Sequence, residues 1–514
     1  MTLDKIWSSI VKKIRPECKR AFLSTMIIGL LTHLFAMTNN LLTFDSMWNI
    51  YSDQDMITSG RQFLTYACSV GSYYDLPLIN GILAIFYLAV AAALIVDIFN
   101  IEGKILPVLA GGLLVTFPSV ASNFAYSYTI DGYMLAVLLA VMAYYFTCKY
   151  KLGFIGGTVF LSLSLGIYQA EFSFTILLCI FGLMLDILNN SKTKELFSKA
   201  WRYVVMGIGG YAFYIISLNI MLKIRGTAIS GYQGTDKLNS FSLSELPRGL
   251  KAAFDNFYYF VRYGGCFSAT AVMKYSYLLF MALGLVSFIY IFIKKKTYKA
   301  PHNIALLLVL WLCVPFGSCL ITILSPDTYF HLLMRLPWVV IMLFFVALIS
   351  MFNKEAAIKF ETAVSCSFVI FAFIFILQCS VASNIAYFNL NERYEKTYAM
   401  SVRLIDRIEQ TEGYEAGMPI SILGGFPDRN YYPETDITKN DLSGYFGVDG
   451  DYVCNSSGSY QTFMERYCNF TFPILDLNEE IALSETNQFK GMSNFPSKDS
   501  IQIIDDVLVI KFNG

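Results

Sequence analysis

Apolar stretches long enough to cross a lipid bilayer alternate with short loops along most of this chain, and every second loop is basic. A run of about 20 apolar residues crosses the hydrocarbon core as a helix, because a helix satisfies its own backbone hydrogen bonds inside lipid. The pattern ends near Val381. Residues 21–381 are therefore predicted to form an all-α, polytopic membrane domain.

About eleven membrane-spanning helices are expected from the lengths of the apolar runs. Two of the runs, 132–146 and 152–167, are short for a span, so the count carries a margin of one or two. The expected spans are 21–40, 78–98, 105–121, 132–146, 152–167, 172–188, 203–221, 275–293, 304–324, 332–352 and 363–381.

The charges of the loops predict which side of the membrane each loop faces, because cytoplasmic loops carry an excess of Lys and Arg. The N-terminal segment and alternate loops are basic, with the triplet Lys294-Lys295-Lys296 as the clearest case. The N-terminus is thus predicted to be cytoplasmic and the C-terminus external. The predicted external loops are 41–77, 122–131, 168–171, 222–274 and 325–331.

Residues 1–20 are expected to form an amphipathic helix in the cytoplasmic interface, and not a cleavable signal peptide, because no small-residue cleavage site follows the basic segment. Apolar residues recur at helical spacing before Pro16, with lysines opposite them. The apolar set is Leu3, Ile6, Trp7, Ile10, Val11 and Ile14, and the lysines are Lys5, Lys12 and Lys13.

Residues 382–514 have the composition of a small α/β domain outside the membrane. A helix is expected over 384–412 and a strand over 419–423. Two further strands, 501–504 and 507–510, are expected to pair through a turn at Asp505-Asp506. Cys454 and Cys468 are the only cysteines of this segment, and a disulfide between them is one expectation for an oxidising compartment.

Composition excludes some functions. The chain is 56% hydrophobic and only 15% charged, with zero formal net charge, so no nucleic-acid partner is expected. No Gly-rich phosphate loop is present. The spans contain no line of carboxylates, which a proton-coupled transporter would need. These observations favour an enzyme that acts at the outer membrane surface.

The first external loop has the richest set of reactive side chains. Asp45 follows the first span closely, and a carboxylate there can accept a proton from an attacking hydroxyl. Asp53 and Asp55 could do the same or bind a divalent cation, Mg²⁺ or Mn²⁺. Arg61 is a planar, permanently charged donor suited to phosphate. The alternative is that these acidic residues only solvate a loop.

Other candidate substrate-binding residues lie at external span ends and in later external loops. Arg335 lies one turn into its span, where it could bind phosphate or only extend to the interface. Tyrosines at span ends stack on sugars less often than they form the interfacial belt. No second ligand accompanies His331, so no zinc site is expected. The candidates are Tyr168, Gln169, Glu171, Arg262, His331 and Arg335.

The membrane region resembles the bacterial GtrII-type glucosyltransferase family, polytopic enzymes of the GT-C class. The resemblance rests on the basic start and the Asp-bearing first external loop. It also rests on Ser59-Gly60-Arg61, on Pro77 before the next span and on Gly166-Ile167-Tyr168-Gln169 at an external span end. Two positions depart from the family pattern. Ser46 stands where the family often has a second acidic residue after Asp45, and Gln62 stands where it often has Trp.

The resemblance implies a polyprenyl-phosphate-linked sugar donor, typically glucose, a cell-surface polysaccharide as acceptor and a bacterial cytoplasmic membrane location. Asp45 is then the expected general base, Arg61 and Arg335 the expected phosphate contacts, and direct displacement with inversion the expected mechanism. Asp53, Asp55 and Glu171 are expected to support them. A lipid-linked glycan flippase or exporter and a polysaccharide polymerase or ligase are the alternatives.

Overall fold

The computed structural model describes residues 2, 4–5, 12–231, 243–263, 265–326, 329–352, 359–425, 427, 430–433, 435–446 and 450–513. The chain divides into two compact units. One, termed the membrane unit, contains Met1–Met37 and Ser52–Asn384. The other, termed the C-terminal unit, contains Thr38–Tyr51 and Ile385–Gly514.

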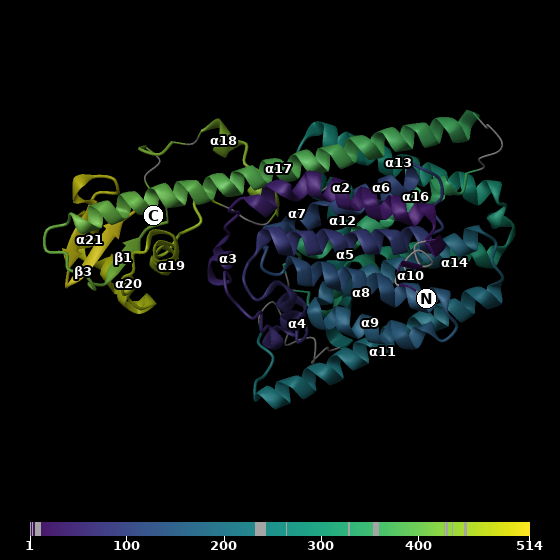
Figure 1. Cartoon of the computed structure of the whole chain (residues 1–514), viewed down its shortest axis with the longest axis horizontal. Helices are drawn as coiled ribbons and strands as arrows, with labels where there is room; N and C mark the ends of the chain where they lie inside the picture. Colours follow the sequence, from purple (N-terminus) through teal and green to yellow (C-terminus); the bar gives the residue numbers. More distant parts are fainter. Residues whose placement is uncertain are drawn as a thin grey trace. The chain divides into compact units, whose positions relative to one another are not determined.

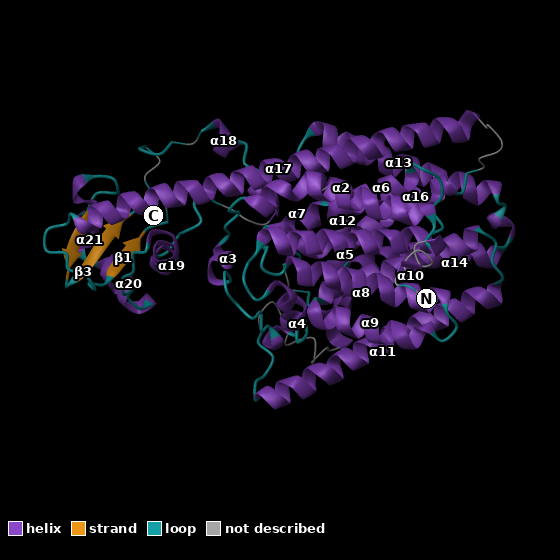
Figure 2. Ribbon diagram, in the orientation of Figure 1, coloured by secondary structure: helices purple, strands orange, loops and turns teal. Residues whose placement is uncertain are grey.

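The membrane unit is a helical bundle (Figures 1 and 2). Helices α5, α8, α9 and α11 pack against one another in that order. Helix α16 is buried almost throughout, whereas α11 exposes most of its surface. The principal helices are α2 (Pro16–Thr38), α5 (Pro77–Ile98), α6 (Leu106–Thr116), α7 (Pro118–Phe124), α8 (Ile130–Lys149), α9 (Gly153–Ile167), α10 (Phe172–Leu188), α11 (Thr193–Arg225), α12 (Leu246–Tyr263), α13 (Ala271–Lys294), α14 (Pro301–Ser318), α15 (Leu320–Leu324), α16 (Val339–Ser350) and α17 (Lys359–Glu409).

Nine helices in the described part of the chain are long and apolar enough to cross a membrane, which makes this a multi-pass membrane protein. A tenth span is formed if α6 and α7 are counted together, although they bend by 44° where Pro118 begins the second helix. The remaining expected span, 152–167, corresponds to α9, which has 15 residues. The predicted polytopic all-α architecture is confirmed.

The predicted cytoplasmic segments gather at one end of the bundle, termed the basic end. Asp97 links Arg15 and Lys149, at 3.4 and 2.8 Å. Further contacts connect the other basic segments to this end: Arg20 to the Gly103 carbonyl, Arg202 to the Tyr150 carbonyl, Lys199 to Asp186, Asn190 to the Lys295 carbonyl, the Glu102 N–H to Ser350, and Lys294 to Glu361.

The C-terminal unit contains a three-stranded sheet in the order β1-β3-β2. Strands β2 (Ile501–Ile504) and β3 (Val507–Lys511) are antiparallel, and their turn places Asp505 and Asp506 at positive φ, as predicted. Strand β1 (Ile420–Leu423) pairs with β3 in parallel. Helix α19 (Ser457–Cys468) packs on β1.

Three features differ from the sequence-based expectation or lie beyond it. The last span and the helix after it are one continuous helix, α17, of 51 residues, because no Pro or Gly interrupts that stretch. Cys454 and Cys468 are free cysteines, so the expected disulfide is not formed. Residues 1, 3 and 6–11 of the expected N-terminal interfacial helix lie outside the described residues.

Segment 38–51 belongs to the C-terminal unit, although the sequence places it in the first external loop. Leu42 and Met47 are buried in the same apolar core as Leu404, Tyr460 and Phe463. This segment contains the short helix α3 (Phe44–Trp48), whose first turn is capped by Thr43. The external loop therefore divides between the two units.

Candidate functional site

Arg61 stands at the end of a tight turn that glycine makes possible. Gly60 adopts φ +75°, the left-handed conformation that glycine reaches without a steric penalty. The Gln169 side-chain amide donates to the Ser59 and Gly60 carbonyls at 3.0 and 2.9 Å. Tyr214 also donates to the Gly60 carbonyl, at 3.1 Å. The turn before Arg61 is thus fixed by side chains from two other helical segments.

The Arg61 guanidinium lies against two stacked tyrosine rings. Its Nη1 donates to the Tyr133 hydroxyl at 2.8 Å, and its Cζ lies 5.2 Å from the centroid of the Tyr168 ring. The two rings stack with centroids 4.2 Å apart. Burial raises the pKa of the Tyr168 hydroxyl well above its usual value. The structure therefore brings together Arg61, Tyr168 and Gln169 from the predicted set.

Glu171 lies beside this group and is 1% exposed. It ends the short helix η3 (Gln169–Glu171), which begins directly after Tyr168. Its Oε2 atom is buried and has no hydrogen-bond partner among the described residues. A carboxyl group in this position can accept a hydrogen bond from a ligand that reaches it.

Asp53 and Asp55 are both exposed in the loop before Arg61. The Asp53 side chain accepts a hydrogen bond from the Asp55 backbone N–H at 3.1 Å, which is an Asx turn. Asp55 forms an ion pair with Arg225 at the end of α11, at 3.5 Å. Within the described residues, no group of three or more His, Cys, Asp or Glu side chains is arranged to hold a metal ion.

Asp45 belongs to the C-terminal unit, so it does not share a unit with Arg61. It lies in the first turn of α3 and is exposed. Its backbone carbonyl accepts a hydrogen bond from the Asn49 side chain at 2.8 Å. An exposed carboxylate can accept a proton from a hydroxyl group that reaches it.

The three remaining candidates lie on other elements of the membrane unit. Arg335, in the short helix η8 (Leu332–Trp338), donates through Nε and Nη2 to the Phe330 carbonyl and lies over the Trp338 ring. Arg262 is exposed on α12 and donates to the Tyr258 hydroxyl. His331 precedes η8 and contacts the Tyr329 ring. Since η8 packs against η3, Arg335 is the one of these whose helix adjoins the Glu171 segment.

Two tyrosines that organise the Arg61 turn were not predicted. Tyr133 and Tyr214 lie one turn into α8 and within α11, and each binds the turn through its hydroxyl group. The sequence places Tyr133 directly after Asp131-Gly132 at a span start, a position where aromatic residues are common. Their contacts with residues 60 and 61 are long-range, so no local pattern indicates them.

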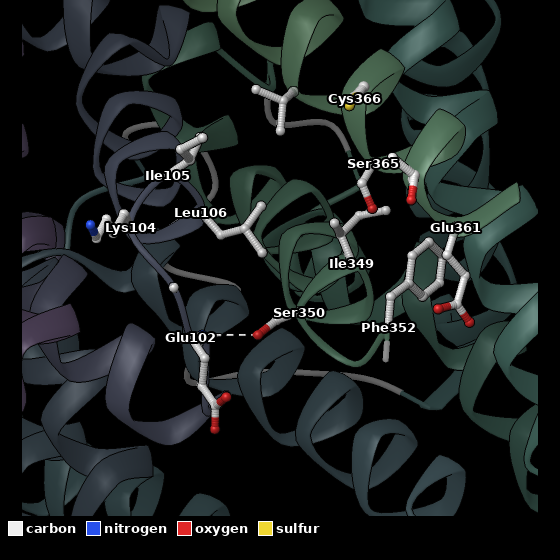
Figure 3. A pocket seen from close by; sticks show the side chains of 13 residues that line it. Glu102, Lys104, Ile105, Leu106, Ile349, Ser350, Phe352, Glu361, Ser365 and Cys366 are labelled. Carbon is white, nitrogen blue, oxygen red and sulfur yellow. Dashed lines mark hydrogen bonds between the residues drawn. The ribbon is translucent and has the colours of Figure 1, made fainter. Parts of the chain in front are cut away.

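Cavities of different size occur at the two ends of the membrane unit. A cavity of about 20 Å³, room for roughly one water molecule, lies between Gln169 and Tyr214. A cavity of about 490 Å³ lies at the basic end, between residues 102–106, the end of α16 and the start of α17 (Figure 3). None of the predicted site residues lines this larger cavity.

Comparison with known proteins gives one family. The family model described as Glucosyl transferase GtrII matches residues 34–351, which is more than half of the chain. No curated protein matches the chain. All of the predicted site residues fall within the matched region, whereas residues 382–514 fall outside it.

Proposed function

Because the chain belongs to the GtrII glucosyltransferase family, we propose that it transfers glucose from a polyprenyl-phosphate donor to a cell-surface polysaccharide at the outer face of a bacterial cytoplasmic membrane. Membership of this family supports glucosyl transfer as the activity. The identity of the donor and of the acceptor, the assignment to the GT-C class and the side of the membrane are proposed in addition.

The proposed reaction is a direct displacement at the anomeric carbon. Asp45 accepts the proton of the acceptor hydroxyl, and the hydroxyl oxygen forms the new bond to C1 of glucose. The bond between C1 and the phosphate oxygen breaks, and its electron pair leaves with polyprenyl phosphate. The configuration at C1 is inverted. Arg61 and Arg335 compensate the negative charge on the leaving phosphate.

The observation that carries this proposal is the fixed guanidinium of Arg61. Its turn is bound by Gln169 and Tyr214, and its side chain rests against Tyr133 and Tyr168. An arginine held this way loses little conformational freedom when it binds a phosphate. The Glu171 carboxyl group also offers a polar acceptor to a sugar that reaches it, and the Tyr168 ring and the Gln169 amide hold Arg61 and its turn beside it. We assign Tyr168, Gln169 and Glu171 to substrate binding.

Asp45→Asn tests the base. We expect sugar transfer from a synthetic polyprenyl-phosphate glucose donor to fall by about 10²–10⁴-fold, because Asn cannot accept the proton. Expression and thermal stability should stay near wild type, since Asp45 is exposed. The matched control is Asp406→Asn, which removes another exposed carboxylate of the C-terminal unit.

A wild-type rate for Asp45→Asn would move the base to Asp53, Asp55 or Glu171, each tested by the corresponding amide. Full rates for all four variants would reject the mechanism and favour a flippase. A polymerase or ligase is separated by the donor, because it would use a lipid-linked oligosaccharide in preference to the single-sugar lipid.

A further inference from the structure

Three buried oxygen atoms near the start of α8 have no hydrogen-bond partner among the described residues. They are Oδ1 of Asp75, Oδ1 of Asn80 and Oδ2 of Asp131. Asn80 is 2% exposed and Asp131 is 1% exposed. Each buried acceptor without a partner costs about 1–3 kcal/mol, so three in one place require an explanation.

Two of the three oxygens face the same point, and Asp75 is linked to Asn80 through Ser127. A Cβ atom added to Gly71 would lie 2.5 Å from Oδ1 of Asn80 and 3.6 Å from Oδ2 of Asp131, so both oxygens face the same point. Asp75 and Asn80 are both anchored on Ser127. The Ser127 hydroxyl donates to Oδ2 of Asp75 at 2.9 Å, and the Asn80 amide donates to the Ser127 carbonyl at 3.1 Å.

The remaining hydrogen bonds of these groups use other atoms and leave the three oxygens without a donor among the described residues. Oδ1 of Asp131 already accepts from the Gly132 N–H at 2.9 Å, and the Cys68 thiol also contacts the Asp131 carboxylate. The two carboxylates act on each other electrostatically, and neither forms an ion pair with a described Lys or Arg. Burial raises the pKa of Asp75 to about 6, which reflects the cost of its charge.

We propose that Asp75, Asn80 and Asp131 bind one hard divalent cation in the space beside Gly71. Two carboxylates and one amide oxygen are ligands that Ca²⁺, Mg²⁺ and Mn²⁺ prefer, and the two negative charges balance a divalent ion. Protonation is the alternative, because a protonated Asp131 carboxyl group could donate to the Asn80 oxygen, and a measurement of cation binding separates the two.

The cation would tie two segments that the chain keeps apart. Asp75 lies just before α5 and Asn80 in its first turn, whereas Asp131 lies in the first turn of α8. Tyr133, which accepts the Arg61 hydrogen bond, follows Asp131 in the same turn. The cation is therefore a positioning element for Tyr133. It is a different place from Asp53 and Asp55.

The test is cation binding by the full-length protein in detergent, after removal of bound metal with EDTA. We expect one Ca²⁺ or Mn²⁺ ion to bind in equilibrium dialysis and the unfolding midpoint to rise by several degrees with saturating cation. Asp75→Asn and Asp131→Asn should lose the bound ion and the rise. Gly71→Ala keeps all three ligands but should lose binding, because its Cβ fills the space.

Asn80→Asp tests the proposal in the opposite direction. A third carboxylate should lower the half-saturating Ca²⁺ concentration at least about tenfold. Asp406→Asn, which changes an exposed carboxylate of the other unit, should bind as wild type does. If Asp131→Asn fails to fold, Asn80→Asp and Gly71→Ala still decide the question.

Two results would overturn the proposal. One is that wild type binds no more Ca²⁺ or Mn²⁺ than Asp131→Asn and that cation does not change its unfolding midpoint, in which case protons neutralise the carboxyl groups. The other is that Asp53→Asn removes the bound ion while Asp75→Asn and Asp131→Asn retain it. Neither result depends on sugar transfer, so this proposal can fail without the proposed function failing.

Discussion

At the scale of single residues, Arg61 is the best-supported side chain, because four other side chains, including Tyr214, hold it or the turn before it. Tyr133 accepts from its guanidinium, Tyr168 supports it, and Gln169 fixes the carbonyl before it. Lysine keeps the charge but offers a single, freely rotating ammonium in place of the planar group.

We expect Arg61→Lys to lower kcat/KM for glucose transfer by about 10–100-fold, which is a loss of about 1.4–2.8 kcal/mol of transition-state stabilisation. The matched control is Arg202→Lys, since Arg202 also donates to one main partner, the Tyr150 carbonyl, but lies at the basic end. Transfer rates from a synthetic donor measure both. Equal rates for Arg61→Lys and wild type would show that only charge matters at this position.

The residue identities could be predicted from the sequence more readily than their contacts. Arg61, Tyr168, Gln169 and Glu171 stand out because they lie at external span ends, and the structure brings them into one neighbourhood. Their partners could not be predicted, since Tyr133 is 72 residues from Arg61 in the chain. Side-chain contacts at such separations depend on how helices pack, and local periodicity contains no information about that.

At the scale of elements, the tight turn before Arg61 depends on Gly60. Two features act together there: the left-handed backbone, and the close approach of Tyr214 and Gln169, whose Oη and Nε2 atoms would lie 2.6 and 2.7 Å from an added Cβ. Gly226 ends α11 with a similar φ of +65° but has no atom within 4 Å of an added Cβ. Substitutions at Gly60 and Gly226 therefore separate the effect of backbone strain from the effect of steric crowding.

We expect Gly226→Ala to cost about 1 kcal/mol of unfolding free energy with unchanged transfer, because only the backbone is strained. Gly60→Ala should lower the unfolding midpoint further and also reduce transfer, because its Cβ displaces the hydrogen bonds that fix the turn. Thermal unfolding and transfer rates on both variants provide the comparison. If Gly60→Ala behaves as Gly226→Ala does, the hydrogen bonds from Gln169 and Tyr214 to the turn have no role in activity.

Element boundaries show where sequence patterns fail. The strands at 501–504 and 507–510 were predicted within one residue, because alternation and the Asp505-Asp506 turn are local signals. The sequence predicted two separate helices, 363–381 and 384–412, because the composition changes between them. The structure joins them in one helix, α17, because every residue there tolerates helical backbone.

At the scale of the whole molecule, the basic loops gather at one end of the membrane unit. All of the basic segments with described contacts meet at one end of the membrane unit, and Arg15, Asp97 and Lys149 connect three of them directly. Positive charge of this kind stays on the cytoplasmic side during insertion.

We expect alkaline phosphatase fused after residue 514 to be active and the same enzyme fused at Lys296 to be inactive, since it folds only outside the cytoplasm. Activity of fusions in intact cells measures this. A fusion at Asn100, in another basic-end loop, should match the one at Lys296. The reverse pattern would place the Arg61 turn on the cytoplasmic side and reject the proposed donor geometry.

The sharing of segment 38–51 with the C-terminal unit has a consequence for biosynthesis. Leu42 and Met47 leave the ribosome roughly 340 residues before Ile385, which begins the rest of that unit. At about 5–20 residues per second, they wait roughly 17–68 s for the chain that buries them. During that interval the apolar side chains of segment 38–51 remain exposed beside the membrane unless a chaperone or lipid binds them. The last-made domain of this protein is thus completed by one of its first-made segments.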